Sequence, residues 1–155
     1  MNRILSNKKL LIGIVVAILV IIVIAVLVLK KQPEKDKLLL KCTFSDLGGE
    51  YDVTRVVTLT KTTDGDILSD KILTTNIKTN SALEILDLMI KNKIASYDSK
   101  YITYKKSDTE LEINIVLNLS EISNNEKITY IGTSDTTPEN LKDGFESGGL
   151  QCEKY

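Results

Sequence analysis

The stretch ELEINIVLNLS, residues 110–120, alternates between apolar and polar side chains at every position except Val116. A repeat of two residues is that of a β-strand, and a single apolar side indicates a strand with one face on a core. Strands of this kind are typical of antiparallel sheets with one solvated face. We therefore expect the chain to fold around such a sheet. The side chains expected to point inward are Leu111, Ile113, Ile115, Leu117 and Leu119.

Five other segments carry strand signals. In residues 51–61 polar and apolar side chains alternate, although Arg55 interrupts the apolar face. The dipeptide Asp64-Gly65 then predicts a hairpin, because it readily adopts the turn that matches the twist of paired strands. The remaining strand segments are 38–44, 67–78, 100–106 and 128–131.

A helix is predicted from Ser81 to Ile94. Ser81 and Glu84 have the spacing of a capping box, in which each side chain satisfies a free amide at the helix start. Apolar residues then recur every three or four positions, which places them on one face. The expected inward set is Leu83, Leu86, Met89, Ile90 and Ile94, and the expected outward set is Glu84, Asp87 and Lys91.

A second helix is predicted to begin at Thr137-Pro138-Glu139, with an N-cap, a proline at its first position and a carboxylate in its first turn. Leu141 and Phe145 are its expected buried side, and Gly148-Gly149 ends it. The resulting order is β-β-β-α-β-β-β-α. This order predicts an α+β fold in which an antiparallel sheet packs with two helices.

The N-terminal part of the chain contains an uncharged segment of twenty residues, Leu10–Leu29. A helix of this length is roughly 30 Å long, the thickness of a bilayer's hydrocarbon core. A cleaved signal peptide would have a shorter apolar region, and a lipoprotein would not carry Lys41 directly before Cys42. A buried helix in a soluble domain is disfavoured because the remaining chain is too short to surround it. We expect a basic tail at 1–9, a single transmembrane helix at 10–29, a linker at 30–37 and one domain at 38–155.

The orientation of this anchor is less evident, because three Lys and Arg residues precede it and four follow it closely. Long domains translocate largely regardless of their charge, and short basic tails usually stay in the cytoplasm. The N-terminus is therefore expected in the cytoplasm and the C-terminal domain outside the cell membrane.

The two cysteines, Cys42 and Cys152, lie at the two ends of the predicted domain. A disulfide between them would close a loop of 111 residues. In the chain-entropy model such a bridge contributes roughly 4.8 kcal/mol, and it requires an oxidising compartment. Two unrelated buried thiols are the alternative. The disulfide agrees with the extracytoplasmic location and is the pairing we expect.

Charge and composition restrict the function. Residues 38–155 hold 13 Lys and Arg against 19 Asp and Glu, a net charge of −6, so a nucleic-acid partner is not expected. The chain has no histidine, which excludes Ser-His-Asp triads and imidazole metal sites. We expect no catalytic residue, no metal and no cofactor. Most acidic residues lie in predicted turns or on predicted outward faces, and the chief exceptions are Asp70 and Glu121.

Three short motifs, Lys41-Cys42-Thr43, Leu141-Lys142-Asp143 and Gly149-Leu150-Gln151-Cys152, follow the anchor. Together with it they resemble small membrane-anchored envelope proteins of Gram-positive bacteria, which are similar to the YehR-like lipoproteins. The resemblance covers most of residues 38–155 and implies an α+β fold and an envelope location. The chain departs from the lipoprotein members by keeping a transmembrane helix in place of a lipidated cysteine. That family has no assigned function or catalytic residues.

Three functional hypotheses follow. The first is a non-enzymatic binding or interaction domain displayed on the outer face of the membrane. The second is a receptor for a small hydrophobic or peptide ligand, held between the sheet and its helices. The third is a two-carboxylate hydrolase, since an acidic domain always offers pairs of carboxylates. A concave apolar pocket would favour the receptor.

Overall fold

The computed structural model describes residues 36–155. The described residues form six strands and three α-helices. In chain order they are β1 (Lys37–Asp46), β2 (Asp52–Thr62), β3 (Gly65–Thr75), α2 (Asn80–Ile94), the 3-10 turn η1 (Ser99–Tyr101), β4 (Ile102–Lys106), β5 (Leu111–Asn118), α3 (Asn124–Ile131), α4 (Pro138–Ser147) and β6 (Gln151–Lys154).

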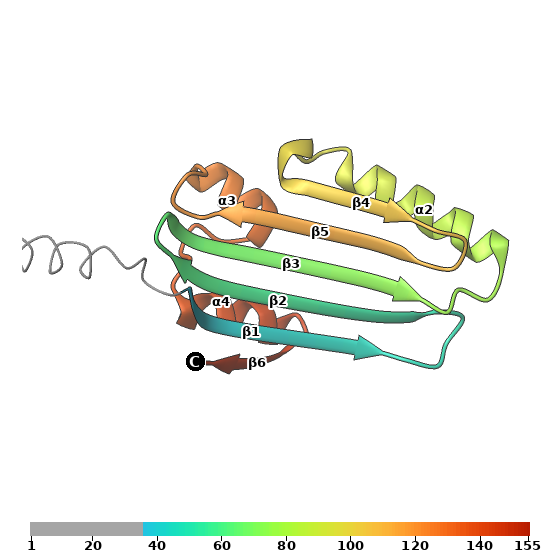
Figure 1. Cartoon of the computed structure of the whole chain (residues 1–155), viewed down its shortest axis with the longest axis horizontal. Coiled ribbons are helices and arrows are strands. Elements are labelled where there is room, and N and C mark those ends of the chain that lie inside the picture. Colours follow the sequence, from blue (N-terminus) through green and yellow to red (C-terminus); the bar gives the residue numbers. More distant parts are fainter. Residues whose placement is uncertain (1–35) are drawn as a thin grey trace, which may run out of the picture. The chain divides into compact units, whose positions relative to one another are not determined.

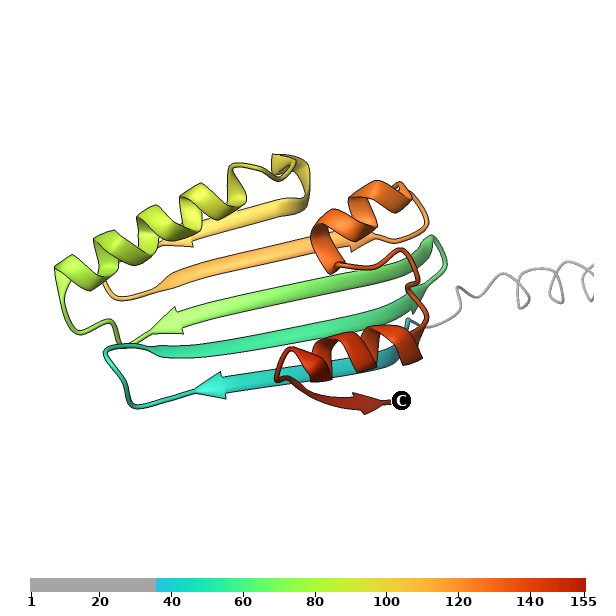
Figure 2. The same cartoon turned by 180° about the vertical axis from the view of Figure 1, so that it is seen from behind.

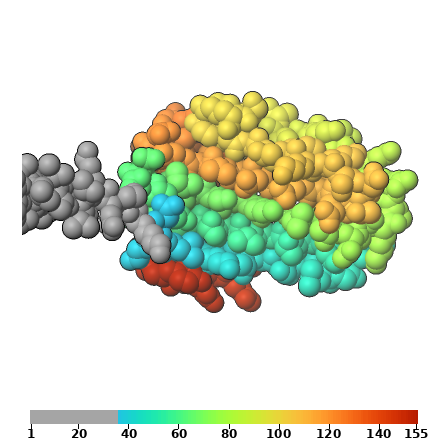
Figure 3. All heavy atoms as spheres, viewed as in Figure 1, coloured from blue at the N-terminus to red at the C-terminus, as the bar shows by residue number. Residues whose placement is uncertain are grey.

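The strands make one antiparallel sheet with the order β4-β5-β3-β2-β1-β6 (Figure 1). All three helices lie on the same face of the sheet, as Figure 2 shows from behind. Seen from the other side, neighbouring strands lie side by side with no helix over them (Figure 3). The α+β class and the sheet with one solvated face are therefore confirmed.

The alternation in residues 110–120 sets the inner face of β5. Leu111, Ile113 and Leu117 are buried there, and Ile115 packs against the main core. That core also receives Leu141 from α4, which lies over β1 and β6. A smaller second cluster, Ile77, Leu83 and Leu111, holds α2 to the other end of the sheet. The two clusters leave the middle of the sheet only partly covered.

The hairpin between β2 and β3 is confirmed, but its turn lies one residue earlier than Asp64-Gly65. Thr62 pairs with Gly65, so Thr63 and Asp64 form the loop. Gly65 has a φ of +129°, and a Cβ there would lie 2.5 Å from the Ser120 hydroxyl. A side chain at this position would be strained and would also clash, which explains the glycine.

The strand expected at residues 128–131 is wrong, because this segment belongs to α3. The Ser123 hydroxyl accepts from the amide of Glu126 at 3.3 Å, and Glu126 Oε2 accepts from the amide of Ser123 at 2.8 Å. This capping box starts a helix whose third residue is Glu126. The domain therefore has three helices, not two. The capping box expected at Ser81 is also wrong, since Thr79 caps α2 and accepts from the amide of Ala82 at 3.2 Å.

Helix α2 is turned so that Asp87, and not Met89, faces the sheet. Asp87 is buried and accepts hydrogen bonds from the Tyr104 hydroxyl at 2.7 Å, from Lys106 Nζ at 2.7 Å and from Lys91 Nζ at 3.0 Å. Met89 is 63 % exposed. The inward position expected for Met89 and the outward position expected for Asp87 are both wrong. Hydrogen-bond donors on β4 offset the cost of burying the Asp87 carboxylate. The periodicity of the α2 sequence alone cannot reveal these partners.

We expect Asp87→Asn to destabilise the domain at neutral pH and to have a smaller effect in acid. The Lys106 ammonium, and next the Tyr104 hydroxyl, hold the pKa of Asp87 well below its usual range. Because the folded-state pKa lies below the unfolded value of about 4, the carboxylate stabilises the fold above that value. This stabilisation is lost as the pH falls through the folded-state pKa. Chemical denaturation of both proteins at about pH 7 and about pH 2.5 checks the expectation. An equal difference in unfolding free energy at the two pH values would contradict it.

Cys42 and Cys152 face each other across β1 and β6 and are joined by a disulfide. Cys42 is fully buried in the main core. The predicted pairing is confirmed, and the bridge ties the last strand of the domain to the first.

The transmembrane helix expected at 10–29, the tail at 1–9 and nearly all of the linker at 30–37 lie outside the described residues. Within residues 36–155, no helix is long and apolar enough to cross a membrane.

Candidate functional site

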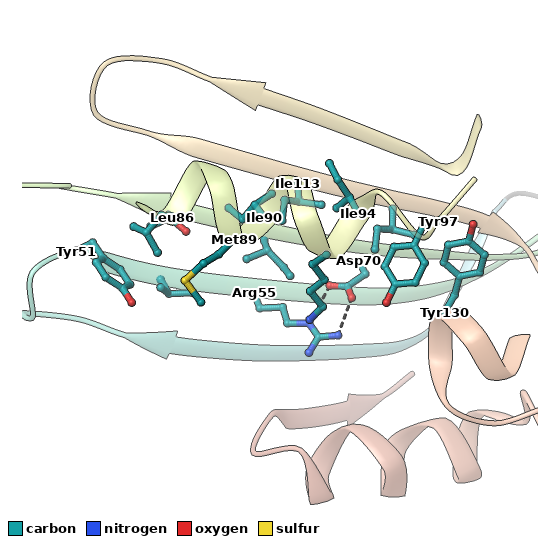
Figure 4. A pocket seen from close by; sticks show the side chains of 15 residues that line it. Tyr51, Arg55, Asp70, Leu86, Met89, Ile90, Ile94, Tyr97, Ile113 and Tyr130 are labelled. Atoms are coloured by element: carbon teal, nitrogen blue, oxygen red, sulfur yellow. Dashed lines mark hydrogen bonds and ion pairs between the residues drawn. The ribbon is translucent and has the colours of Figure 1, made fainter. Parts of the chain in front are cut away.

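A groove of about 350 Å³ opens on the helical face of the sheet, beside α2 (Figure 4). Its floor consists of inward-facing side chains of β2, β3 and β5. Its wall is the side of α2 that carries Leu86, Ile90 and Ile94. The volume lies at the lower end of the range for pockets that bind small molecules. The groove occupies the part of the sheet between the two core clusters.

The lining of the groove is mainly aliphatic. Ile72, Ile113 and Ile115 form the floor under α2, and Met89 lies at the exposed edge of the wall. The periodicity of α2 indicated Leu86, Ile90 and Ile94 as inward residues, and they do face the sheet side of the helix. They are only half-buried because the groove, rather than packed core, lies beside them. The surface is suited to an apolar group of a ligand.

One ion pair lies in this apolar floor. Arg55 Nε donates to Asp70 Oδ1 at 3.0 Å, and Arg55 Nη2 donates to Oδ2 at 2.7 Å. The two residues are diagonal neighbours on one face, since Arg55 pairs with Ile72 and Asp70 pairs with Val57. Arg55 is the residue that interrupts the apolar pattern of residues 51–61. The interruption therefore marks the polar centre of the groove.

The pair with Asp70 does not use all the donors of Arg55. Nη1, and the second hydrogen of Nη2, have no hydrogen-bond acceptor among residues 36–155. The guanidinium is half-buried and lies 5.9 Å from the centre of the Phe145 ring. A fixed guanidinium with spare donors can bind an acceptor group of a ligand in two-point geometry.

Tyrosines mark both ends of the groove, with Tyr51 at one end and Tyr97 and Tyr130 at the other (Figure 4). The rings of Tyr97 and Tyr130 are 4.9 Å apart, and the Tyr130 hydroxyl accepts from the amide of Asp98 at 2.7 Å. Burial raises the pKa of Tyr130, so its hydroxyl stays neutral. Lys93 of α2 is exposed and also lines the groove. The charged residues of the groove are Arg55, Lys93 and Asp70, so its net charge is +1.

The two carboxylates singled out in the sequence do not form a pair. Asp70 is buried in the groove and bound to Arg55, whereas Glu121 is exposed and is not among the residues that line the groove. Within residues 36–155 no group of three Cys, Asp or Glu side chains could hold a metal ion. The arrangement is suited to holding a ligand by apolar contact and one polar anchor.

The three comparisons with known proteins were negative. No protein-family model matches the chain, and neither a curated protein nor a solved structure is detectably similar to it.

Proposed function

We propose that the domain is a non-enzymatic binding module that holds an aliphatic carboxylate in the groove beside α2. The observation that carries this proposal is a half-buried arginine with spare donors in the floor of an aliphatic groove. The aliphatic part of the ligand lies against the isoleucines, and its carboxylate binds Arg55. This is the receptor hypothesis with a defined ligand chemistry.

The charges favour an anionic head group. Asp70 neutralises Arg55 formally, and Lys93 adds a positive charge at the edge of the groove. A carboxylate next to Arg55 gains charge-assisted hydrogen bonds, whereas an ammonium group would be repelled by both cations. The acidic net charge of the rest of the domain disfavours anions at other surfaces, so selective binding is expected at this groove.

The proposed setting is the outer face of a cell membrane, to which the chain is anchored through residues 10–29. The disulfide supports this setting, because such bonds persist in oxidising compartments. The uncharged segment of twenty residues supports the anchor. The resemblance to YehR-like lipoproteins agrees with this location and stays a prediction.

Binding of dodecanoate to a fragment of residues 36–155 tests the proposal. The fragment contains every strand, both core clusters and the disulfide, and circular dichroism checks that it is folded. We expect titration calorimetry to show dodecanoate bound at least about tenfold more tightly than dodecanol, since a charge-assisted hydrogen bond contributes about 1.5–3 kcal/mol. Dodecyltrimethylammonium has the same chain with the opposite charge and should bind more weakly than either.

The double variant Arg55→Gln/Asp70→Asn removes both charges without leaving one unpaired. It should lose the preference for dodecanoate over dodecanol and keep the fold. The matched control is Lys71→Gln/Glu112→Gln, which removes an ion pair of 2.9 Å between two other neighbouring strands, β3 and β5, on the open face. Equal affinity of the wild type for dodecanoate and dodecanol, or the same loss in both double variants, would refute groove binding. Turnover of ester or glycoside substrates by the fragment would favour the hydrolase instead.

A further inference from the structure

The outer side of α2 carries an apolar stripe that no other element of residues 36–155 covers. Ile85 and Leu88 are 57 and 61 % exposed, although side chains of these types usually lie in cores, and Met89 beside them, at the edge of the groove, is 63 % exposed. Figure 2 shows α2 in front of the sheet with no helix or strand over its outer side. Exposed aliphatic side chains that lie next to each other on one helix indicate an interaction surface.

The stripe has the spacing of a coiled-coil seam. Ser81, Ile85, Leu88 and Asn92 follow one another at intervals of four, three and four residues, and all four are exposed. Such intervals keep side chains on one line along a helix. Glu84 and Lys91 are seven residues apart, so they lie on the same flank of this line.

We propose that two copies of the chain pair through this stripe with their α2 helices antiparallel. In an antiparallel pair, the flank of one helix that carries Glu84 and Lys91 faces the same flank of the partner helix, which runs in the opposite direction. When Ile85 packs beside the partner's Leu88, Glu84 comes opposite the partner's Lys91, and the contact is repeated by symmetry. In a parallel pair opposite flanks of the two helices face each other, so Glu84 and Lys91, which share one flank, would not meet. The opposite charges therefore meet only in the antiparallel arrangement, which is the one the charge pattern favours.

Both flanking charges are available for this contact. Glu84 is exposed and forms no ion pair within residues 36–155. Lys91 contacts Asp87, but that carboxylate is already paired with Lys106. A lipid surface is a poorer occupant, because an acidic domain is repelled by anionic head groups. A second copy matches both the apolar line and its charges.

The test measures self-association of the full chain in mild detergent by energy transfer between copies labelled with donor or acceptor at the N-terminus. We expect Leu88→Gln to raise the dimer dissociation constant at least about tenfold. Ile128→Gln replaces another exposed aliphatic residue, on α3 and outside the stripe, and should leave the constant unchanged. Both positions are exposed, so both variants should fold.

Charge reversal tests the antiparallel register. Glu84→Lys and Lys91→Glu should each weaken pairing several-fold, because every exchanged contact becomes repulsive. The double variant Glu84→Lys/Lys91→Glu should restore pairing, since opposite charges again meet across the interface. A monomeric wild type, a dimer insensitive to Leu88→Gln, or a double variant as weak as the two single ones would overturn the proposal. These outcomes do not depend on a ligand in the groove.

Discussion

Replacing Leu117 with aspartate is expected to abolish cooperative folding of the domain. Leu117 is 1 % exposed and lies on the inner face of β5 within the main core. The change removes a fully buried leucine, which alone costs about 2–5 kcal/mol, and introduces an unpaired buried charge. The sum approaches the entire stability of a typical domain, about 5–15 kcal/mol. Circular dichroism during urea denaturation should show no native baseline.

The neighbouring position supplies the control for this change. Val116 is 42 % exposed on the open face of the sheet, so Val116→Asp introduces the same side chain into the same strand without burying it. Its cost should be about 1 kcal/mol, the usual span of strand propensities. Similar losses of stability for the two variants would mean that the open face is covered by a partner or that β5 faces the other way.

Loss of the disulfide is the second large effect. The bridge spans a sequence separation of 110 residues, so removing it frees nearly the whole domain in the unfolded state. The chain-entropy model gives a loss of roughly 4–5 kcal/mol for a loop of this size. Cys42→Ala/Cys152→Ala is the suitable variant, because serine would bury a hydroxyl in the core at position 42.

Urea denaturation of this variant, of the oxidised wild type and of the reduced wild type measures the effect. Reduction and substitution should lower the unfolding free energy by similar amounts, and peptide mapping without reductant should show the two cysteine peptides linked. Equal stability of oxidised and reduced protein would contradict the expectation. Free thiols in protein isolated from its native cells would show that the bridge does not form there.

Local patterns in the sequence predicted the parts of the fold that depend on neighbours along the chain. The alternation in residues 110–120, the hairpin and the helix after Thr137 are of this kind, and each is found. The strand predicted at 128–131 failed because the segment, Ile-Thr-Tyr-Ile, is only four residues long. The capping box at Ser123 and Glu126 determines its structure and begins the helix at Asn124, four residues earlier.

The site could be predicted only in part, because it depends on register. Arg55 was visible as a polar interruption, but its partner depends on where the hairpin turns. A turn at Asp64-Gly65 would pair Arg55 with Thr74. Asp70 would then lie four residues along β3 from the residue that pairs with Arg55, too far for a diagonal contact. The turn at Thr63-Asp64 instead makes Arg55 and Asp70 diagonal neighbours. The orientation of α2 likewise depends on residues distant in the sequence, because two partners of Asp87 lie on β4.

The most direct test of groove binding is methyl and arginine side-chain NMR of the 36–155 fragment during titration with dodecanoate. Binding in the groove predicts shifts of the Ile90, Ile94 and Ile113 methyl groups and of the Arg55 Nε–H, all of which face the groove. The methyl groups of Ile67 and Val116, on the open face, should not move. Shifts confined to the open face or to Ile85 and Leu88 on the outer side of α2, with Arg55 unchanged, would contradict it.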